Sequence, residues 1–568
     1  MNRRYRYATR SPHCALLVAC VMVPGFSLGA DLTGTVKDKE GHPLTGALVT
    51  LTARGGMFAE SVYVGRDGHY SLHSEQEGKA TLRARNPYFS DVTLDINLPS
   101  GAPRDFVLAR LVDPQAISDS LPASAHFAAL HFERPLDRQW FQVDCLSCHQ
   151  IGNAFTRARR PPERWHEIVG QMLSEYGVKN DTRLDIYANV LENTFNAVPP
   201  LVEHHNSQLY GEVLPAKIIE WKLPGSIYPH DTIYRPTDRR FYTVDQGNDA
   251  IYITDPLPGT TETYTLPKSA ALPGEKPLDP TPSNMFVTGV HSPHSLQEGP
   301  NGHLYTTNSV SNQIGEFDPK AHTYVGYNLG ADAEYPHTLR IDRRGQVWFT
   351  IAFSNKVGMF DTHSHKMRFI SLPADSDRPQ ITPQLQFPYG IDINPTDDSV
   401  WYASLLANRI GRIDPQTFKV ESFTPPTVGP RRLRFAKDGT LWIPDFGRGR
   451  LIKLDTRLMK YKSYTIPSLS KGEVEAPYAV VVDSNTQEVW ITSNMSDRMF
   501  RFLPREERFI AYPLPARGTY LRDLIITPEG MVCGANNPVP VTVLEGGMGE
   551  VLCLDPTGNM RFSRPARE

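Results

Sequence analysis

The chain is poor in cysteine and carries no strong excess of charge. Only six of its 568 residues are cysteines, and no second C-x-x-C pair accompanies Cys145 and Cys148. A zinc site built from two such pairs is therefore excluded. The 62 acidic and 59 basic residues are interspersed, which argues against a nucleic acid or an anionic membrane surface as the partner.

Two further absences narrow the class of protein. No apolar run is long enough to cross a bilayer, and no G-x-G-x-x-G fingerprint of a dinucleotide site occurs. The 48 prolines and 41 glycines are spread along the chain, so we expect few long helices and many turns. The length allows three or four domains. Together these features predict a mainly β protein without a transmembrane span.

Residues 1–30 have the pattern of an export signal. A basic start that includes Arg3 and Arg4 is followed by an apolar run and then by small residues. Residues 17–20 also resemble a lipoprotein signal with Cys20 as the lipidated residue, although the apolar run continues beyond it. We expect a secreted, periplasmic protein, with lipid attachment as the alternative.

The sequence Cys145-Leu146-Ser147-Cys148-His149 is the C-x-x-C-H signature of c-type haem attachment. Two thiols at this spacing reach the two vinyl groups of one porphyrin, and the adjacent imidazole then lies under the iron. The alternative is half of a zinc site, which needs a second pair of ligands that the sequence lacks. We predict one covalent haem c, with His149 as an iron ligand.

Residues 112–210 are expected to form a small helical cytochrome c domain around this motif. Pro161 and Pro162 suit the start of a helix, and a second helix is expected from near Asp181. In the first helix the apolar residues repeat on one face: Trp165, Ile168, Val169, Met172, Leu173 and Tyr176.

Met172 is the predicted sixth ligand of the haem iron, because its thioether lies on this apolar face. The run from Arg164 to Met172 resembles the cytochrome c domain of quinohaemoprotein amine dehydrogenases, and the resemblance implies the same role for the methionine. The alternatives are a methionine that only packs in the core, or ligation by His166, His204 or His205. Arg157, Arg159 and Arg160 are candidates for pairing with the haem propionates.

Residues 31–111 are predicted to form a small β-sandwich. Short alternating strands flank turn-rich segments around residues 38–44 and 66–69. The pattern G-x-V-x-D-x-x-G-x-P-L-x-G-A-x-V-x-L, followed by D-G-x-Y, resembles the carboxypeptidase regulatory-like family. The resemblance implies a transthyretin-like, non-catalytic module.

Residues 211–568 carry an internal repeat of short strands, which predicts a β-propeller. The repeat unit begins seven times, which suggests seven blades. Several copies begin with a proline followed by a histidine, as in Pro293-His294 and Pro336-His337. The phrases P-H, W-F-T, N-x-I-G-R-I-D-P and L-P resemble the virginiamycin B lyase-like propeller family. Either residues 217–224 or residues 559–562 are expected to complete the last blade, and the sequence leaves that choice open.

The repeat brings chemistry-bearing residues to one face of the propeller. We expect His230, His294 and His337 near one central mouth, where they could act as acid and base or bind a divalent metal. His291 is a fourth candidate. Other residues expected on this face are Arg431, Arg432, Arg522, Asp245, Asn308, Asp445, Asn494 and Asn536. The alternative is that these positions recur only because every blade packs alike.

The predicted function is periplasmic electron transfer, with a cytochrome or dehydrogenase as the redox partner and a small molecule as a further candidate ligand. The virginiamycin B lyase-like family, as we understand its pattern, places glutamate where this chain has Tyr228, Ser292 and Tyr335, so a metal-dependent lyase is the less favoured alternative. A non-catalytic binding platform is the third. Whether Cys533 and Cys553 pair as a disulfide or stay separate thiols is open at this stage.

Overall fold

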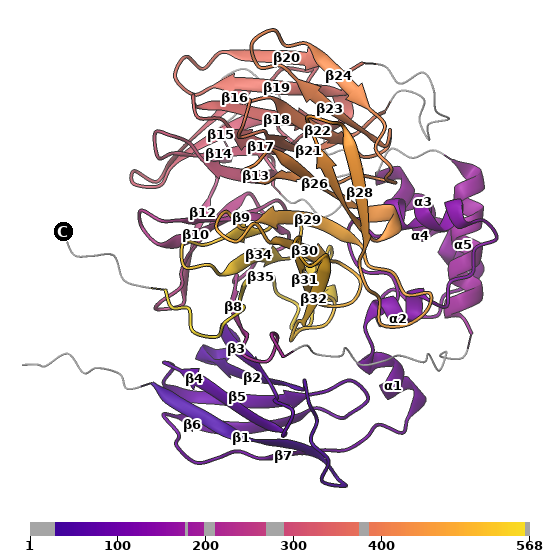
Figure 1. Cartoon of the computed structure of the whole chain (residues 1–568), viewed down its shortest axis with the longest axis vertical. Coiled ribbons are helices and arrows are strands. Elements are labelled where there is room, and N and C mark those ends of the chain that lie inside the picture. The colour runs from indigo at the N-terminus through magenta and orange to yellow at the C-terminus, as the bar shows by residue number, and fades with distance from the viewer. Residues whose placement is uncertain (1–28, 176–179, 198–210, 269–288, 374–384, 563–568) are drawn as a thin grey trace, which may run out of the picture.

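The computed structural model describes residues 29–175, 180–197, 211–268, 289–373 and 385–562. The predicted export signal, including Cys20, falls almost entirely outside these ranges, as do His204 and His205. Within them no helix combines the length and hydropathy needed to span a membrane. The chain forms an N-terminal sandwich, a propeller and a group of helices at one side of the propeller (Figure 1).

The sandwich is built from two sheets, as its alternating strands predict. Its burial pattern follows the alternation, with inward residues buried and outward residues exposed in the first strand. One sheet has the order β4 (His69–Ser74), β1 (Ala30–Asp38), β7 (Phe106–Leu108). The other has the order β3 (Phe58–Tyr63), β2 (Leu48–Ala53), β5 (Gly78–Arg85), β6 (Val92–Leu98).

The second sheet of the sandwich continues into the propeller through a single strand. β8 (Lys217–Lys222) pairs with β3 on one edge and with β35 (Glu550–Asp555) on the other. Trp221 is thereby in register with both Phe58 and Val551. The result is one eight-stranded sheet shared by the two domains. Residues 217–222 therefore complete the last blade, while Phe562 packs its ring 5.7 Å from that of Trp221.

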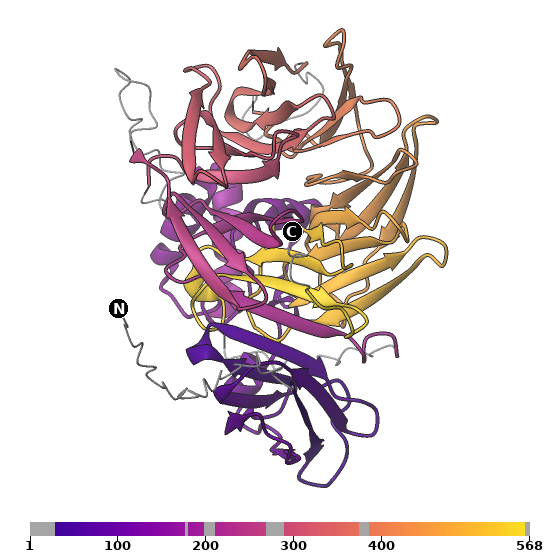
Figure 2. The same cartoon turned by 90° about the vertical axis from the view of Figure 1, so that its left-hand side faces the viewer.

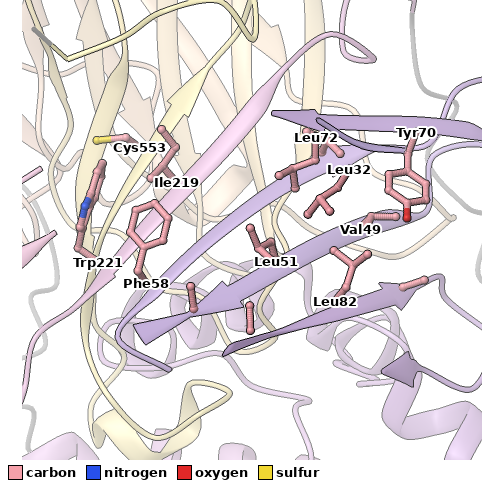
Figure 3. Close-up of a cluster of buried hydrophobic side chains, with 14 of the residues drawn as sticks. Leu32, Val49, Leu51, Phe58, Tyr70, Leu72, Leu82, Ile219, Trp221 and Cys553 are labelled. Carbon is pink, nitrogen blue, oxygen red and sulfur yellow. The ribbon is translucent and has the colours of Figure 1, made fainter. Parts of the chain in front are cut away.

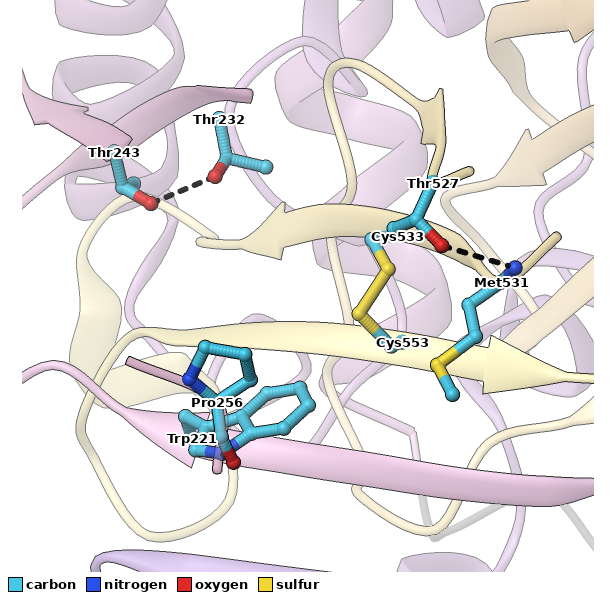
Figure 4. The surroundings of a disulfide bond; sticks show 8 residues. All are labelled: Trp221, Thr232, Thr243, Pro256, Thr527, Met531, Cys533 and Cys553. Carbon is cyan, nitrogen blue, oxygen red and sulfur yellow. Dashed lines mark hydrogen bonds between the residues drawn. A yellow bond between two sulfur atoms is a disulfide. The ribbon is translucent and has the colours of Figure 1, made fainter. Parts of the chain in front are cut away.

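The junction between sandwich and propeller has a common apolar core. Phe58 of the sandwich lies with its ring 6.0 Å from that of Trp221, next to Ile219 (Figure 3). Cys533 and Cys553 are directly opposite each other on neighbouring strands and form a disulfide (Figure 4). The open choice between disulfide and free thiols is thus resolved in favour of the disulfide, which lies inside this core.

The propeller has seven four-stranded antiparallel sheets within the described residues, the last one shared with the sandwich. The first three blades are β9 (Pro229–Arg235), β10 (Arg240–Asp245), β11 (Ala250–Asp255), β12 (Thr260–Thr265); β13 (Pro293–Glu298), β14 (Leu304–Asn308), β15 (Gln313–Asp318), β16 (Thr323–Asn328); and β17 (Pro336–Ile341), β18 (Gln346–Ile351), β19 (Lys356–Asp361), β20 (Met367–Ser371).

The remaining blades are β21 (Pro388–Ile393), β22 (Val400–Ser404), β23 (Arg409–Ile413), β24 (Val420–Phe423); β25 (Arg434–Phe435), β26 (Thr440–Asp445), β27 (Arg450–Asp455), β28 (Lys460–Thr465); β29 (Pro477–Val482), β30 (Val489–Ser493), β31 (Arg498–Leu503), β32 (Arg508–Pro513); and β33 (Ile525–Ile526), β34 (Val532–Asn536) with β35 and β8. Figure 2 shows the blades around a common centre, with the helices behind them.

The repeated phrase N-x-I-G has a physical explanation in the blades. Asn355 and Asn408 adopt the left-handed conformation, with φ of 49° and 54°, which asparagine tolerates better than most residues. Gly358 and Gly411 lie under the rings of Phe349 and Tyr402, and a Cβ there would approach ring atoms to 2.2 and 2.1 Å. The asparagine of this motif therefore forms a turn and the glycine makes room for an aromatic ring, so the motif has a structural role.

The helical segment comprises α1 (Pro114–Ser120), α2 (Ala123–Phe127), α3 (Pro135–Cys145), α4 (Pro162–Glu175) and α5 (Asp181–Phe195). The two helices expected from the sequence, α4 and α5, are confirmed. The Asn180 side chain caps α5 by accepting a hydrogen bond from the backbone N–H of Arg183 at 3.0 Å. Phe141 and Leu146 of this segment share one apolar cluster with Tyr389 and Tyr478 of the propeller. The helices are thus packed on the propeller mouth.

Candidate functional site

A cavity of about 500 Å³ lies between the helical segment and the propeller. This volume is in the range of about 300–1,000 Å³ that small-molecule and cofactor sites occupy. The cavity brings together the predicted haem residues and the three histidines expected at the propeller mouth. Among its lining residues are Cys145, Cys148, His149 and Met172 from the helical segment and His230, His294 and His337 from the propeller.

The C-x-x-C-H motif begins at the C-terminal end of α3. Cys145 is the last residue of that helix, and Cys145 and Cys148 are both partly buried and take part in no disulfide within the described residues. Ser147 is buried and donates a hydrogen bond from Oγ to the carbonyl of Val143 at 2.8 Å, which extends the last turn. The Nδ1 atom of His149 lies 3.0 Å from the carbonyl oxygen of Gln150. That contact leaves Nε2 of His149 available to the cavity.

The propeller holds the motif through its backbone. Nη2 of Arg522 donates to the carbonyl of Cys148 at 2.8 Å, and the backbone N–H of Val539 donates to the same oxygen at 2.9 Å. Arg431 donates to Oγ of Ser147 at 2.5 Å. The hydroxyl of Tyr520 donates to the carbonyl of Leu146. The predicted position of both arginines near the mouth is confirmed, and their contact with this motif is the new element.

The helix α4 forms the opposite wall of the cavity. Its apolar face contributes Trp165, Ile168, Val169 and the half-buried Met172. His166 is not a cavity residue, because it faces Asp185 with its Nε2 3.4 Å from a carboxylate oxygen. The alternative ligand His166 therefore lies outside the cavity lining.

The three arginines that are candidates for pairing with the haem propionates lie in different surroundings. Arg160 lines the cavity, and its guanidinium lies 4.8 Å from the ring centre of Trp165. Arg157 forms an ion pair with Asp119 instead, and Arg159 is exposed and does not line the cavity. Only Arg160 of the three remains a candidate within the described residues.

The propeller histidines form a stack at the mouth. The ring centres of His230 and His294 are 3.8 Å apart, those of His294 and His337 are 3.9 Å apart, and Tyr389 continues the row at 4.0 Å from His337. The residues come from the first strands of four successive blades, so the repeat itself aligns them. All four side chains are buried and line the cavity.

A network of ion pairs lies next to the stack of histidines. Asp231 accepts hydrogen bonds from Nδ1 of His230 at 2.9 Å and from Arg432 at 2.7 Å. Arg432 also lies 3.3 Å from Asp523. Burial lowers the pKa of His230 to about 4, despite the opposing effect of Asp231. Burial, with nearby positive charge, also places the pKa of His294 and that of His337 well below the ordinary value, so the three imidazoles are neutral at pH 7.

The predicted polar residues at the ends of the second strands have a structural role. Asp245 accepts backbone hydrogen bonds from Ile227 and Tyr228, and Asn536 accepts one from Tyr520. They hold the loop that enters a blade. None of the five polar residues expected at the ends of second strands lines the cavity, and neither does His291; the five are Asp245, Asn308, Asp445, Asn494 and Asn536. The side-chain oxygens of Asp245 and Asn536 are occupied by backbone N–H groups, which makes both loop-bracing residues.

Several lining residues were missed at the sequence level: Tyr228, Gln246, Tyr335, Phe387, Tyr389 and Tyr478. The signal was present for two of them, since Tyr389 and Tyr478 follow the initial proline of a blade as the histidines do. In the part of the chain that the structure describes, no group of three or more His, Cys, Asp or Glu side chains is arranged to hold a metal ion. The histidines stack instead of converging.

Comparison with known proteins gives the following findings. Residues 31–110 match the carboxypeptidase regulatory-like domain family, and no curated protein matches the chain. The structure is similar to virginiamycin B lyase from Staphylococcus aureus (18% identity, 60% of this chain and 99% of that chain, TM-score 0.47). It is also similar to a streptogramin B lyase (18% identity, 61% of this chain and 100% of that chain, TM-score 0.48). A third similar structure is Kuenenia stuttgartiensis hydrazine synthase (14% identity, 58% of this chain and 95% of that chain, TM-score 0.43). These similarities concern the fold alone.

Proposed function

We propose that the chain is a periplasmic protein of electron transfer that binds one haem c in the cavity between its helices and its propeller. The observation that carries the proposal is that Cys145, Cys148, His149 and Met172 all line this one cavity. In the sequence Met172 is separated from the motif by a loop and part of a helix. Their meeting in one space is what a covalently attached haem with two axial ligands requires.

The residues present fit such a group. Two thiols at C-x-x-C spacing that take part in no disulfide of the described chain can form the thioether bonds, and Nε2 of His149 is available as one ligand. The thioether of Met172 can be the second ligand. The walls that would enclose the macrocycle are apolar, with Ile151, Phe155, Trp165, Ile168, Val169 and Leu191 among them. Arg160 can pair with a propionate.

A bound haem supplies a one-electron centre that alternates between ferric and ferrous iron. The chain's own residues determine how that centre would behave. With His149 and Met172 as its ligands, the iron of a bound haem would have no open position, which would favour electron transfer over oxygen binding. Arg522, Arg431 and Tyr520 fix the motif against the propeller through its carbonyls and Ser147.

A substrate-binding role of the propeller is favoured over a passive platform by one observation. The stack of His230, His294 and His337 lines the same cavity as the cysteine motif. A platform for another protein would present polar or apolar groups on the outside, whereas these imidazoles are buried and directed into the cavity. The lyase alternative has no comparable support, because the residues that it needs are absent from the expected positions.

The proposal is tested by producing the full chain in cells with the c-type haem maturation machinery. We expect the intact mass to include one haem, a haem-bearing peptide to contain Cys145 and Cys148, and the reduced protein to show the absorption of a low-spin haem c. The double variant C145S/C148S should lack the haem. A variant of exposed His363, H363Q, is the control. A wild-type protein without covalent haem would overturn the proposal.

A further inference from the structure

We propose that the propeller end of the cavity, formed by His230, Gln246, His294, His337 and Tyr389, binds a small phenol whose hydroxyl donates a hydrogen bond to Nε2 of His230. We name this region the histidine pocket. The inference rests on the proposed function in one respect, because it supplies that function with an electron donor. The binding itself depends only on residues that the structure describes.

The hydrogen-bonding state of His230 follows from its neighbours. Its Nδ1 lies 2.9 Å from a carboxylate oxygen of Asp231, which also accepts from Arg432 at 2.7 Å and from Oγ of Ser295 at 2.8 Å. An ionised carboxylate accepts only, so Nδ1 must carry the proton. Nε2 then has a free lone pair on the cavity side. Nε2 of His230 can therefore accept a hydrogen bond from a ligand in the cavity.

Two further polar groups of the pocket lack a partner. Nδ1 of His294 and Oε1 of Gln246 are both buried without a hydrogen bond within the described structure, although each residue is only 2% exposed. Buried polar atoms are nearly always satisfied, and exceptions at a cavity indicate a bound molecule. The oxygen of Gln246 can only accept, which again favours a ligand with a donor group.

The walls around these polar atoms are aromatic. Tyr335 packs against Phe353 with ring centres 4.8 Å apart, and Phe353 against Phe387 at 5.4 Å. Phe387 in turn stacks with Tyr389 at 5.8 Å. An aromatic ligand gains edge and face contacts on such walls, whereas an aliphatic alcohol of the same size does not.

The charge around the pocket distinguishes a phenol from an amine. The guanidinium of Arg522 is buried, lies 4.9 Å from the ring centre of Tyr228, and donates to neutral acceptors on Asn537 and Cys148. Arg432 adds a second buried cation below the stack, although it is paired with Asp231. This positive field opposes an ammonium group as the donor, whereas a neutral hydroxyl can donate to Nε2 of His230 without adding a positive charge. Phenols are also ready one-electron donors, which suits a one-electron centre in the same cavity.

The experiment measures binding of 4-nitrophenol to the full-length haem protein by equilibrium dialysis and by its visible absorption. We expect one site per chain and, in the variant H230Q, at least tenfold weaker binding. The variant H166Q changes a partly exposed histidine of α4 that does not line the cavity and is the matched control. Far-ultraviolet circular dichroism establishes that each variant is folded.

A comparison of ligands tests the same inference without any substitution. 4-Nitroanisole has the same ring and no hydroxyl proton, so it should bind the wild-type protein at least tenfold more weakly than 4-nitrophenol. Equal binding of the two, or preferential binding of benzylamine, would overturn the assignment. If the protein carries no haem but binds 4-nitrophenol as described, the proposed electron-transfer function fails and the histidine pocket stands. If haem is present and 4-nitrophenol does not bind, only the pocket fails.

Discussion

The guanidinium of Arg522, in the last blade of the propeller, donates a hydrogen bond to the backbone carbonyl of Cys148 at 2.8 Å. These two residues are separated by most of the chain, and their contact ties the C-x-x-C-H motif to the propeller mouth. Arg522 also donates to the carbonyl and the side chain of Asn537. The motif is thus held by the propeller itself as well as by its own helices.

Replacement of Arg522 should loosen the motif without unfolding the propeller. In R522A the carbonyl of Cys148 loses its charged donor and keeps only the backbone N–H of Val539, and a hydrogen bond from a charged group contributes about 1.5–3 kcal/mol. We expect faster hydrogen exchange in residues 143–150 and little change in the blades. R522K keeps the charge but not the planar fork, so it should restore exchange only in part. Unchanged exchange in R522A would show that the contact does not hold the motif; the exposed Arg343 supplies the control, R343A.

Replacement of Met172 should open one coordination position of the predicted haem. In M172A the thioether is lost while His149 is retained. We expect the reduced protein to change from low-spin to high-spin absorption, to bind carbon monoxide and to show a shifted reduction potential. Carbon monoxide binding by the wild-type protein, or an unchanged spectrum in M172A, would instead indicate that another residue is the second ligand. H166Q should leave the spectrum unchanged.

The buried histidine stack should make stability depend on pH. The pKa of His230 is about 4 in the folded chain, below the value of about 6.5 that it has when exposed. Between these values the unfolded chain binds a proton that the folded chain does not, so the free energy of unfolding falls as the pH falls from about 7 towards about 4. Denaturant titrations at a series of pH values measure the slope. H294Q and H337Q should each reduce it, and the exposed-site variant H363Q should not.

The contact between the sandwich and the propeller should weaken in acid. Glu545 accepts hydrogen bonds from Arg83 at 2.8 Å and from Arg85 at 2.5 and 2.6 Å, and these arginines lower its pKa to about 2. A lowered folded pKa gives stability that is present above about 4.5 and is lost as the pH falls towards about 2.

We expect E545Q to lower the stability of the domain contact by about 1 kcal/mol, since the pair is partly exposed to water. Limited proteolysis between the sandwich and α1 measures the loosening. E421Q alters a carboxylate in an exposed ion pair and provides the comparison. Identical cleavage of E545Q and the wild-type protein at neutral pH would contradict the expected role of Glu545.

Short-range patterns made much of the architecture predictable. The proline at the start of most first strands and the tryptophans of several second strands repeat because each blade packs against the next, so they predicted the strands around Trp348 and Trp401. The apolar face of α4 followed from helical spacing in the same way. Local spacing also identified the histidines of the mouth, since they occupy equivalent positions of successive blades.

The relationships that define the site depend on long-range docking, which a single sequence does not encode locally. Nothing in residues 145–149 indicates that Arg522 and Tyr520 will bind their carbonyls. The role of Asp245 was misjudged for a similar reason, because an acid at the end of a strand is as suitable for bracing a loop as for chemistry. The partner of β8 could not be chosen from the sequence, since β8 has two partners.

The strand β8 has a consequence for how electrons could leave the molecule. The helical segment follows β7, which pairs with β1 of the sandwich, and leads into β8, which pairs with both domains. A carrier domain on a single flexible tether can swing between two sites at a high effective concentration. Here both ends of the segment are anchored in one continuous framework, so the redox partner that we propose would have to diffuse to it. Transfer should therefore be second order in that partner and should saturate only through complex formation.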